Sequence, residues 1–81
     1  MKIIYDPPKR ETTLAVRKLD MADLTLAFFE SATIFPAKDE RLMAIGPFQD
    51  TLITVIFKFL GTEAISVISM RRASRKERML L

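Results

Sequence analysis

The spacing of apolar residues changes once along the chain, and this change constrains the fold more than any other feature. Before residue 33, apolar side chains recur at intervals of three and four, as in Met21, Leu24, Ala27 and Phe28, which is typical of an amphipathic helix. From Thr33 onward the period is two, which is typical of β-strands. We therefore expect one α+β domain over residues 1–81, with the helices before most of the sheet.

Turn and cap signals divide the chain into seven expected elements. Pro7 and Pro8 end the first strand, because proline lacks an N–H and its fixed φ suits the first turn of a helix. Asp20 is expected to cap the second helix, and Gly46-Pro47 with Gln49-Asp50 to form a turn before the longest strand. The order is β-α-α-β-β-β-β, with two helices packed on an antiparallel sheet, strands at residues 2–6, 33–35, 41–45, 51–59 and 64–71, and the first helix at about 8–18.

Side-chain alternation assigns residues to the two faces of the predicted sheet. Thr54, Ile56 and Lys58 share the wetter face, which we expect to stay open. Arg71 and Arg72 point to opposite sides of a regular strand, so only one of them can share a face with Lys58. The opposite face is expected to lie under the helices, and the phenylalanines assigned to the core are Phe28, Phe29, Phe57 and Phe59.

The composition excludes several classes of site. The chain has no cysteine and no histidine, so disulfides, thiolate chemistry, zinc sites and Ser-His-Asp triads are not available. It has two glycines, too few for a phosphate-cradling loop. No cofactor or metal is expected. The chain shows neither an apolar leader nor a run of about 18 apolar residues, so we expect a cytoplasmic protein with no membrane contact.

The positive charge of the chain is concentrated at its end. Residues 71–81 hold five of the thirteen basic side chains and one acid, a net charge of +4, whereas residues 1–70 have a net charge of −1. This excess directly follows a predicted strand, and a rigid sheet can present arginines to a polyanion. The pattern predicts that the partner is a phosphate backbone.

The arginines, lysines and hydroxyl groups suffice for one reaction, the cleavage of RNA by its own 2′-hydroxyl group. The nucleophile belongs to the substrate, so the protein has only to orient the strand, stabilise charge on the phosphorane and assist proton transfer. Arginine binds phosphate through two parallel hydrogen bonds, and a lysine with a lowered pKa can act as a base. This hypothesis requires the guanidinium groups to converge in space.

Each candidate side chain also has a purely structural interpretation. The tail cations Arg75, Lys76 and Arg78 can form a solvated tail or helix end, and the apolar residues 79–81 can dock on this chain or on a partner.

The strand residues have similar alternatives. Lys58 can protect a sheet edge from aggregation, and Arg41 can pair with Asp39 or Glu40. Arg71 and Arg72 are hardest to explain in this way, because no acidic run is expected opposite them.

Three stretches of the chain match a known pattern. Tyr5-Asp6-Pro7-Pro8-Lys9, with Leu19-Asp20-Met21-Ala22-Asp23 and Phe28, forms an opening match. The stretch from Arg41 to Gly46 resembles ER-x-x-x-x-G, and residues 68–78 resemble IS-x-R-x-A-[ST]-x-x-E-R almost throughout. Through these stretches the chain resembles the BrnT family, toxins of type II toxin–antitoxin modules. The resemblance implies a RelE-like fold.

The resemblance also implies a function and partners. It implies a ribonuclease that cleaves mRNA, inhibits translation and is neutralised by BrnA, a ribbon-helix-helix antitoxin, in a hetero-oligomer. In such modules the complex binds promoter DNA through the antitoxin.

The resemblance carries the candidate site onto seven basic residues. The catalytic candidates are Arg41, Lys58, Arg71 and Arg72, and the substrate-binding candidates are Arg17, Lys18 and Arg75. The chain departs from the family at three places: Tyr5 replaces a tryptophan, Lys58 replaces a hydroxyl residue, and Val16-Arg17-Lys18 replaces a Lys-His-Gly run. The missing histidine would be a natural proton-transfer group, and Arg17 cannot act as a base at neutral pH.

Two other functions therefore compete with the metal-independent ribonuclease. One is a catalytically impaired module that binds the antitoxin and acts in promoter autoregulation. The other is nucleic-acid binding without cleavage, which steep salt dependence with intact RNA would identify.

Overall fold

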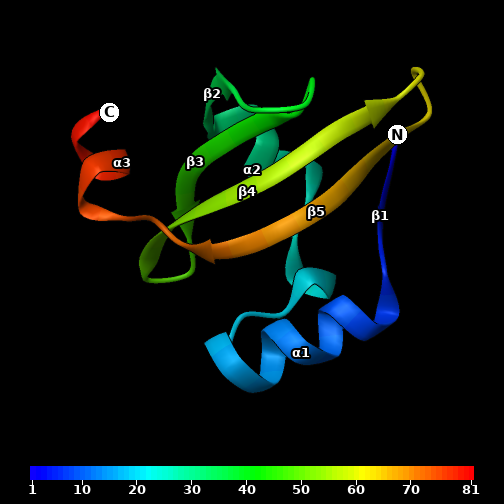
Figure 1. The fold of residues 1–81 in the computed structure, drawn as a ribbon, viewed down its shortest axis with the longest axis horizontal. Helices are drawn as coiled ribbons and strands as arrows, with labels where there is room; N and C mark the ends of the chain where they lie inside the picture. The colour runs from blue at the N-terminus through cyan, green and yellow to red at the C-terminus, as the bar shows by residue number, and fades with distance from the viewer.

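A five-stranded sheet forms the centre of the fold (Figure 1), and the computed structural model describes all residues, 1–81. The strand order is β1-β5-β4-β3-β2, with β1 parallel to β5 and every other pair antiparallel. The α+β class is confirmed. The strands are β1 (Lys2–Tyr5), β2 (Thr33–Pro36), β3 (Leu42–Phe48), β4 (Thr51–Leu60) and β5 (Ala64–Arg72), and the helices are α1 (Pro7–Arg17), the 3₁₀ turn η1 (Met21–Asp23), α2 (Leu26–Ser31) and α3 (Arg75–Met79).

The predicted second helix is two separate pieces. Asp20 is an N-cap as expected, because its side chain accepts a hydrogen bond from the backbone N–H of Ala22, but it caps only the short turn η1. Thr25 then begins α2 by accepting from the backbone N–H of Phe28. A second capping hydroxyl inside the apolar pattern therefore ends one piece and starts the next.

The expected turn over Gly46-Pro47 and Gln49-Asp50 is only partly correct. Gln49 and Asp50 form the turn between β3 and β4, but Gly46 and Pro47 belong to β3 and pair with Ile53 and Leu52 of β4. Proline is tolerated here because β2 pairs with β3 only as far as Ile45, which leaves the outer edge of β3 free beyond that point. Gly46 is needed because a Cβ atom would lie 3.0 Å from the backbone of Ala32.

The core lies between the sheet and the segment that contains η1 and α2. Ile53, Val55 and Phe57 of β4 point into it and are at most 2% exposed, as the alternation predicts. Phe59 was also assigned to this core, but it lies near the end of β4 and is 51% exposed. Its ring still contacts Phe57 edge-on, with the centroids 5.6 Å apart.

A β-bulge in β5 sets which residues face the other side. Ile56 pairs with Ser69, whereas the next residue of β4, Phe57, pairs with Val67, so Ile68 is an extra residue. The bulge lets both Val67 and Met70 point into the core. The side of the sheet opposite the core is called the open face here: its rows include Lys58 beside Ser66 and Thr54 beside Arg71.

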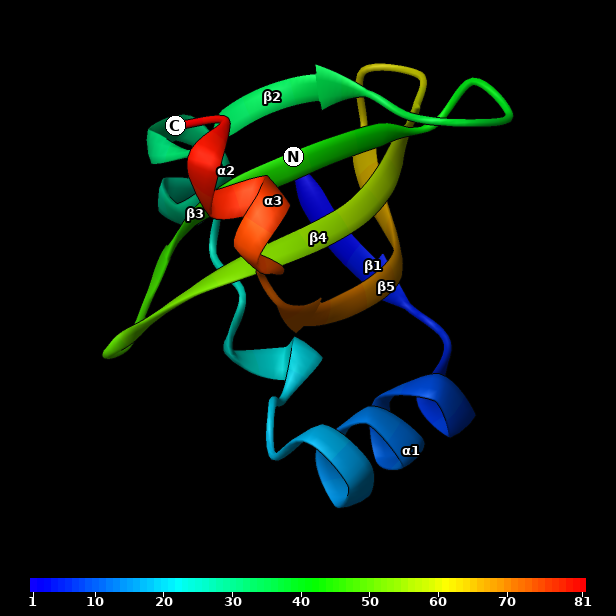
Figure 2. The ribbon, with the colours of Figure 1, turned by 60° about the vertical axis from the view of Figure 1, so that its left-hand side comes forward.

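One end of the open face is covered by α3, an element that was not predicted. Figure 2 shows α3 lying over β3 and β4, on the opposite side of the sheet from α2. Thr54 was expected to be solvated, but it is 0% exposed. None of the helices combines the length and the apolar character needed to cross a bilayer.

Candidate functional site

Arg71 and Arg72 project to opposite faces of the sheet. Arg71 pairs with Thr54 across β4 and β5 and lies on the open face, which it shares with Lys58. Arg72 pairs with Ile53, a core residue, and therefore lies on the side of the helices. The two adjacent arginines therefore lie in different environments and cannot bind one phosphate group together.

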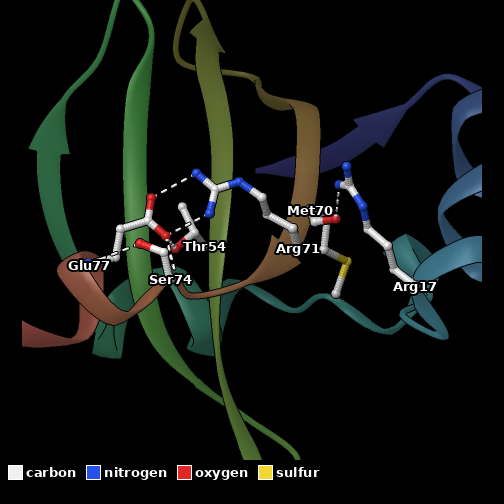
Figure 3. A network of polar contacts seen from close by, with 6 residues as sticks. All are labelled: Arg17, Thr54, Met70, Arg71, Ser74 and Glu77. Carbon is white, nitrogen blue, oxygen red and sulfur yellow. Dashed lines mark hydrogen bonds and ion pairs between the residues drawn. The ribbon is translucent and has the colours of Figure 1, made fainter.

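Arg71 is held by a carboxylate of α3 (Figure 3). Its two terminal nitrogens donate to the two oxygens of Glu77, Nη1 to Oε1 at 2.6 Å and Nη2 to Oε2 at 2.7 Å. The buried hydroxyl of Thr54 donates to Glu77 Oε1 at 2.9 Å, and the backbone N–H of Ser74 donates to the same oxygen at 2.8 Å. The expectation that Arg71 lacks an acidic partner is therefore wrong.

This network perturbs both ionisable groups. The hydrogen bonds from Arg71 lower the pKa of Glu77 from its ordinary 4.5 to about 2, with Ser74 and Thr54 adding to the effect. The same carboxylate raises the pKa of Arg71. Glu77 is therefore a fully ionised and weakly basic carboxylate at neutral pH, and its oxygens accept four hydrogen bonds. It does not have the properties of a general base.

Arg72 and Arg17 join the end of α1 to the end of β5. Arg17 Nη1 donates to the backbone oxygen of Met70 at 2.8 Å, and Arg72 Nη1 donates to the backbone oxygen of Arg17 at 2.7 Å. Figure 3 shows Arg17 on the far side of β5 from Arg71. Lys18 follows directly and ends α1 with a positive φ of 59°. The structure thus brings Arg17, Lys18 and Arg72 together at one end of α1.

A groove of about 360 Å³ lies between α1 and β5 beside this group. Its polar lining comes from Lys9, Thr12, Thr13, Arg17 and Ser69. It exists because β1 pairs with β5 only as far as Val67, which leaves the outer edge of the last part of β5 without a neighbouring strand.

Lys58 and Arg41 lie at the opposite end of the open face from Arg71. Both are exposed, and neither has an ion pair or side-chain hydrogen bond. Leu42 of β3 pairs with Phe57 of β4. Arg41 directly precedes Leu42 and Lys58 directly follows Phe57, so the two cations lie at the same end of these neighbouring strands. The expected pairing of Arg41 with Asp39 or Glu40 does not form.

Arg75 lies at the first residue of α3 and is exposed. The seven candidate cations therefore form separate groups instead of one cluster around a single phosphate: Arg71 in the Glu77 network with Arg75 nearby in sequence, Arg17 with Lys18 and Arg72, and Lys58 with Arg41. No group of three acidic side chains lies close enough to hold a metal ion.

Glu77 and Thr54 belong to the site, although neither was predicted from the sequence. One signal in the sequence marks Glu77: Ser74-Arg75-Lys76-Glu77 has the Ser-x-x-Glu pattern of a capping box. In the structure Ser74 accepts from the backbone N–H of Glu77 at 3.1 Å, and the Glu77 side chain bonds back to Ser74. Nothing in the sequence links Thr54 to Glu77, because 23 residues separate them.

Comparisons with known proteins agree on one family. Residues 5–77 match the model for the ribonuclease toxin BrnT of type II toxin–antitoxin systems. The fold is similar to the 1.1 Å crystal structure of the Brucella abortus ribonuclease toxin BrnT, with 59% sequence identity and a TM-score of 0.86, over 93% of this chain and 99% of that one. A search of curated proteins gave no match. The chain therefore belongs to the BrnT family of ribonuclease toxins of type II toxin–antitoxin systems.

Proposed function

We propose that this protein is a metal-independent endoribonuclease that binds a single RNA strand along its open face and cleaves it with the strand's own 2′-hydroxyl group. The observation that carries the proposal is the register of β4 and β5, which places Lys58 and Arg71 on the same face of the sheet. Lys58 lies four positions along β4 from Thr54, the residue opposite Arg71, a span of about 13 Å at ~3.3 Å per residue. The two cations therefore suit different phosphates of one strand.

The middle of the open face suits an RNA strand between these two ends. Met43, Ile56 and Ser69 form adjacent positions of β3, β4 and β5 there, and all three are partly exposed. Apolar side chains can pack against bases while the cations contact the backbone. Such a surface binds without reading sequence, because both kinds of contact are available to every nucleotide.

The reaction needs no group that the chain lacks. The 2′-oxygen attacks the adjacent phosphorus, the 5′-oxygen leaves, and the products are a 2′,3′-cyclic phosphate and a 5′-hydroxyl end. Arg71 stabilises the charge that develops on the phosphorane, Lys58 and Arg41 hold the neighbouring backbone, and solvent carries the transferred protons. The chain has no histidine or cysteine and no acidic group of three, so its own side chains favour a mechanism without a metal.

The remaining candidate cations serve as flanking contacts in this proposal. Arg72, Arg17 and Lys18 lie together across β5, and Arg75 lies at the start of α3. An RNA strand that continues past Arg71 reaches either group. These residues act by counterion release, so their removal weakens binding without altering the reaction at the bound phosphate.

The family supports a second part of the proposal, neutralisation by a BrnA-type ribbon-helix-helix antitoxin in a hetero-oligomer that binds promoter DNA through the antitoxin. The family description names a type II toxin–antitoxin system. Met79, Leu80 and Leu81 are 77%, 54% and 55% exposed, and such an apolar end suits contact with a partner. Free toxin is proposed to cleave mRNA in the cytoplasm and so to inhibit translation.

RNA cleavage by the purified protein tests the enzymatic proposal. Incubation with total RNA is expected to give fragments with cyclic phosphate ends at equal rates with and without a chelator. Lys58→Ala is expected to slow cleavage at least tenfold. Lys9→Ala is the matched control, since Lys9 is an exposed cation of α1 outside the open face and has no hydrogen bond or ion pair. Equal losses in both variants would contradict the assignment of the open face.

Expression in a bacterial host separates the competing functions. A ribonuclease arrests growth, and co-expression of the neighbouring antitoxin relieves the arrest. A catalytically impaired module leaves growth unchanged and the RNA intact, yet still binds the antitoxin. A nucleic-acid-binding protein without activity retards RNA in a salt-dependent way and leaves it uncut.

A further inference from the structure

We propose that Glu77 is a positioning residue that fixes the guanidinium group of Arg71 in the orientation that RNA binding requires. The inference rests on the proposed function and adds to it a residue that carries the wrong charge for phosphate. A carboxylate on a phosphate-binding face repels the ligand unless its charge is already compensated. Glu77 meets this condition, because it is 12% exposed and is paired with Arg71 through two hydrogen bonds.

The pair leaves one edge of the guanidinium group free. Arginine has five N–H donors, and Glu77 uses one from each terminal nitrogen. Arg71 Nε makes no hydrogen bond, and no side-chain nitrogen in the buried part of the structure is left without a partner, so Nε is accessible to solvent. The Nε–H and the adjacent outer N–H form a second fork, which is the arrangement that binds two phosphate oxygens.

Glu77 is itself held rigidly enough to act as a support. The hydroxyl of Thr54 comes from the central strand β4, and the N–H of Ser74 comes from the turn before α3, so two elements fix Glu77 Oε1. The capping box also ties the backbone of Glu77 to Ser74. Figure 3 shows Arg71 extended across β4 towards this carboxylate. Without Glu77, a long and flexible side chain would have to lose its rotational freedom when RNA binds.

Glu77 does not act as the catalytic base in this scheme. Its pKa is lowered to about 2, and its oxygens accept four hydrogen bonds in the absence of RNA. Glu77 also does not block phosphate binding by Arg71, because the bonds to Glu77 and the proposed bonds to phosphate use different edges of the guanidinium group.

A double-mutant cycle tests the inference on binding. The probe is a short single-stranded RNA in which a 2′-O-methyl group replaces every 2′-hydroxyl, so that no 2′-oxygen can attack. Glu77→Gln is expected to weaken its binding about fivefold when Arg71 is present and less than twofold in an Arg71→Ala background. Equal losses in the two backgrounds would overturn the inference, and so would tighter binding by Glu77→Gln. The folded fraction is measured for each variant and the affinity is expressed per folded molecule.

The two proposals fail in distinguishable ways. If the parent protein does not cleave RNA but the cycle is non-additive, the ribonuclease proposal fails and the role of Glu77 stands. If the parent cleaves RNA and the cycle is additive, only the role of Glu77 fails. Glu77→Asp supplies a rescue arm: it keeps the charge, and we expect it to recover part of the affinity that Glu77→Gln loses. Lys76→Gln is the matched control, because Lys76 is an exposed neighbour in α3 with no hydrogen bond or ion pair.

Discussion

The two ends of the open face are built differently. At one end Arg71 is half-buried and fixed by Glu77, whose carboxylate is in turn fixed by Thr54 and by α3. At the other end Lys58 and Arg41 are exposed and free of partners. The difference shows that Arg71 takes part in the hydrogen bonds that hold the fold together, whereas Lys58 on the same face does not. Substitutions should therefore affect stability at the first end and only binding at the second.

The largest expected effect is on stability, from Glu77→Ala. The substitution leaves the buried Thr54 hydroxyl and the Arg71 guanidinium group without their acceptor and removes the capping box of α3. We expect a loss of about 3 kcal/mol in the free energy of unfolding, from urea denaturation. A loss below 1 kcal/mol would mean that solvent replaces these hydrogen bonds without penalty, and the contrast between the two ends would disappear.

Acid should act on the same end of the face. The folded-state pKa of Glu77 is about 2, below its ordinary 4.5, so the stability from this group is complete above pH 4.5 and is lost as the pH falls from 4.5 towards 2. Asp20, paired with Arg10, behaves in the same way, because its pKa is lowered from 3.8 to about 2. Thermal melts across this range should show a smaller decrease for Glu77→Gln than for the parent.

Removing the hydroxyl alone gives an intermediate effect. Thr54→Val keeps the shape and β-branching of the buried side chain and deletes one of four hydrogen bonds to Glu77. We expect a loss of about 1 kcal/mol in the free energy of unfolding. Leu52 is the next residue of β4 on the same face, and Leu52→Val, a change without loss of a hydrogen bond, serves as the comparison. A neutral or stabilising result would show that the apolar replacement compensates for the lost bond.

The smallest effect on stability is expected at the free end. Lys58→Ala should change the free energy of unfolding by less than about 0.5 kcal/mol, because exposed, unpaired side chains contribute little. Its effect should appear in binding instead: the slope of log affinity against log salt for single-stranded RNA should decrease by about 0.7, the value for one phosphate contact. An unchanged slope would remove Lys58 from the interface.

The sequence was enough to locate the five strands, because alternation of apolar residues is a local property, but it did not show that β3 continues through Gly46 and Pro47. Ile53, Val55 and Phe57 were placed correctly, and so was the separation of Arg71 from Arg72. It was not enough for α3, since the helix is five residues long and none of its residues is buried. The capping box was its one local signal.

The candidate site was less predictable than the fold. The family resemblance supplied Arg71, but its partners Glu77 and Thr54 come from two other elements, and only the folded chain brings them together. The convergence of seven cations was an assumption about distances that a sequence does not contain. The sheet separates them by its two faces and by the length of β4.

The extra residue in β5 has a consequence for how chains of this kind are aligned and read. Before Ile68 the odd-numbered residues Ile65 and Val67 face the core, and after it the even-numbered Met70 does. The strand thus has two phases of alternation joined at one position. Uninterrupted alternation from Val67 would turn Met70 to the open face and Arg71 to the side of the helices, so a single surplus residue decides which of two neighbouring guanidinium groups lies on the open face.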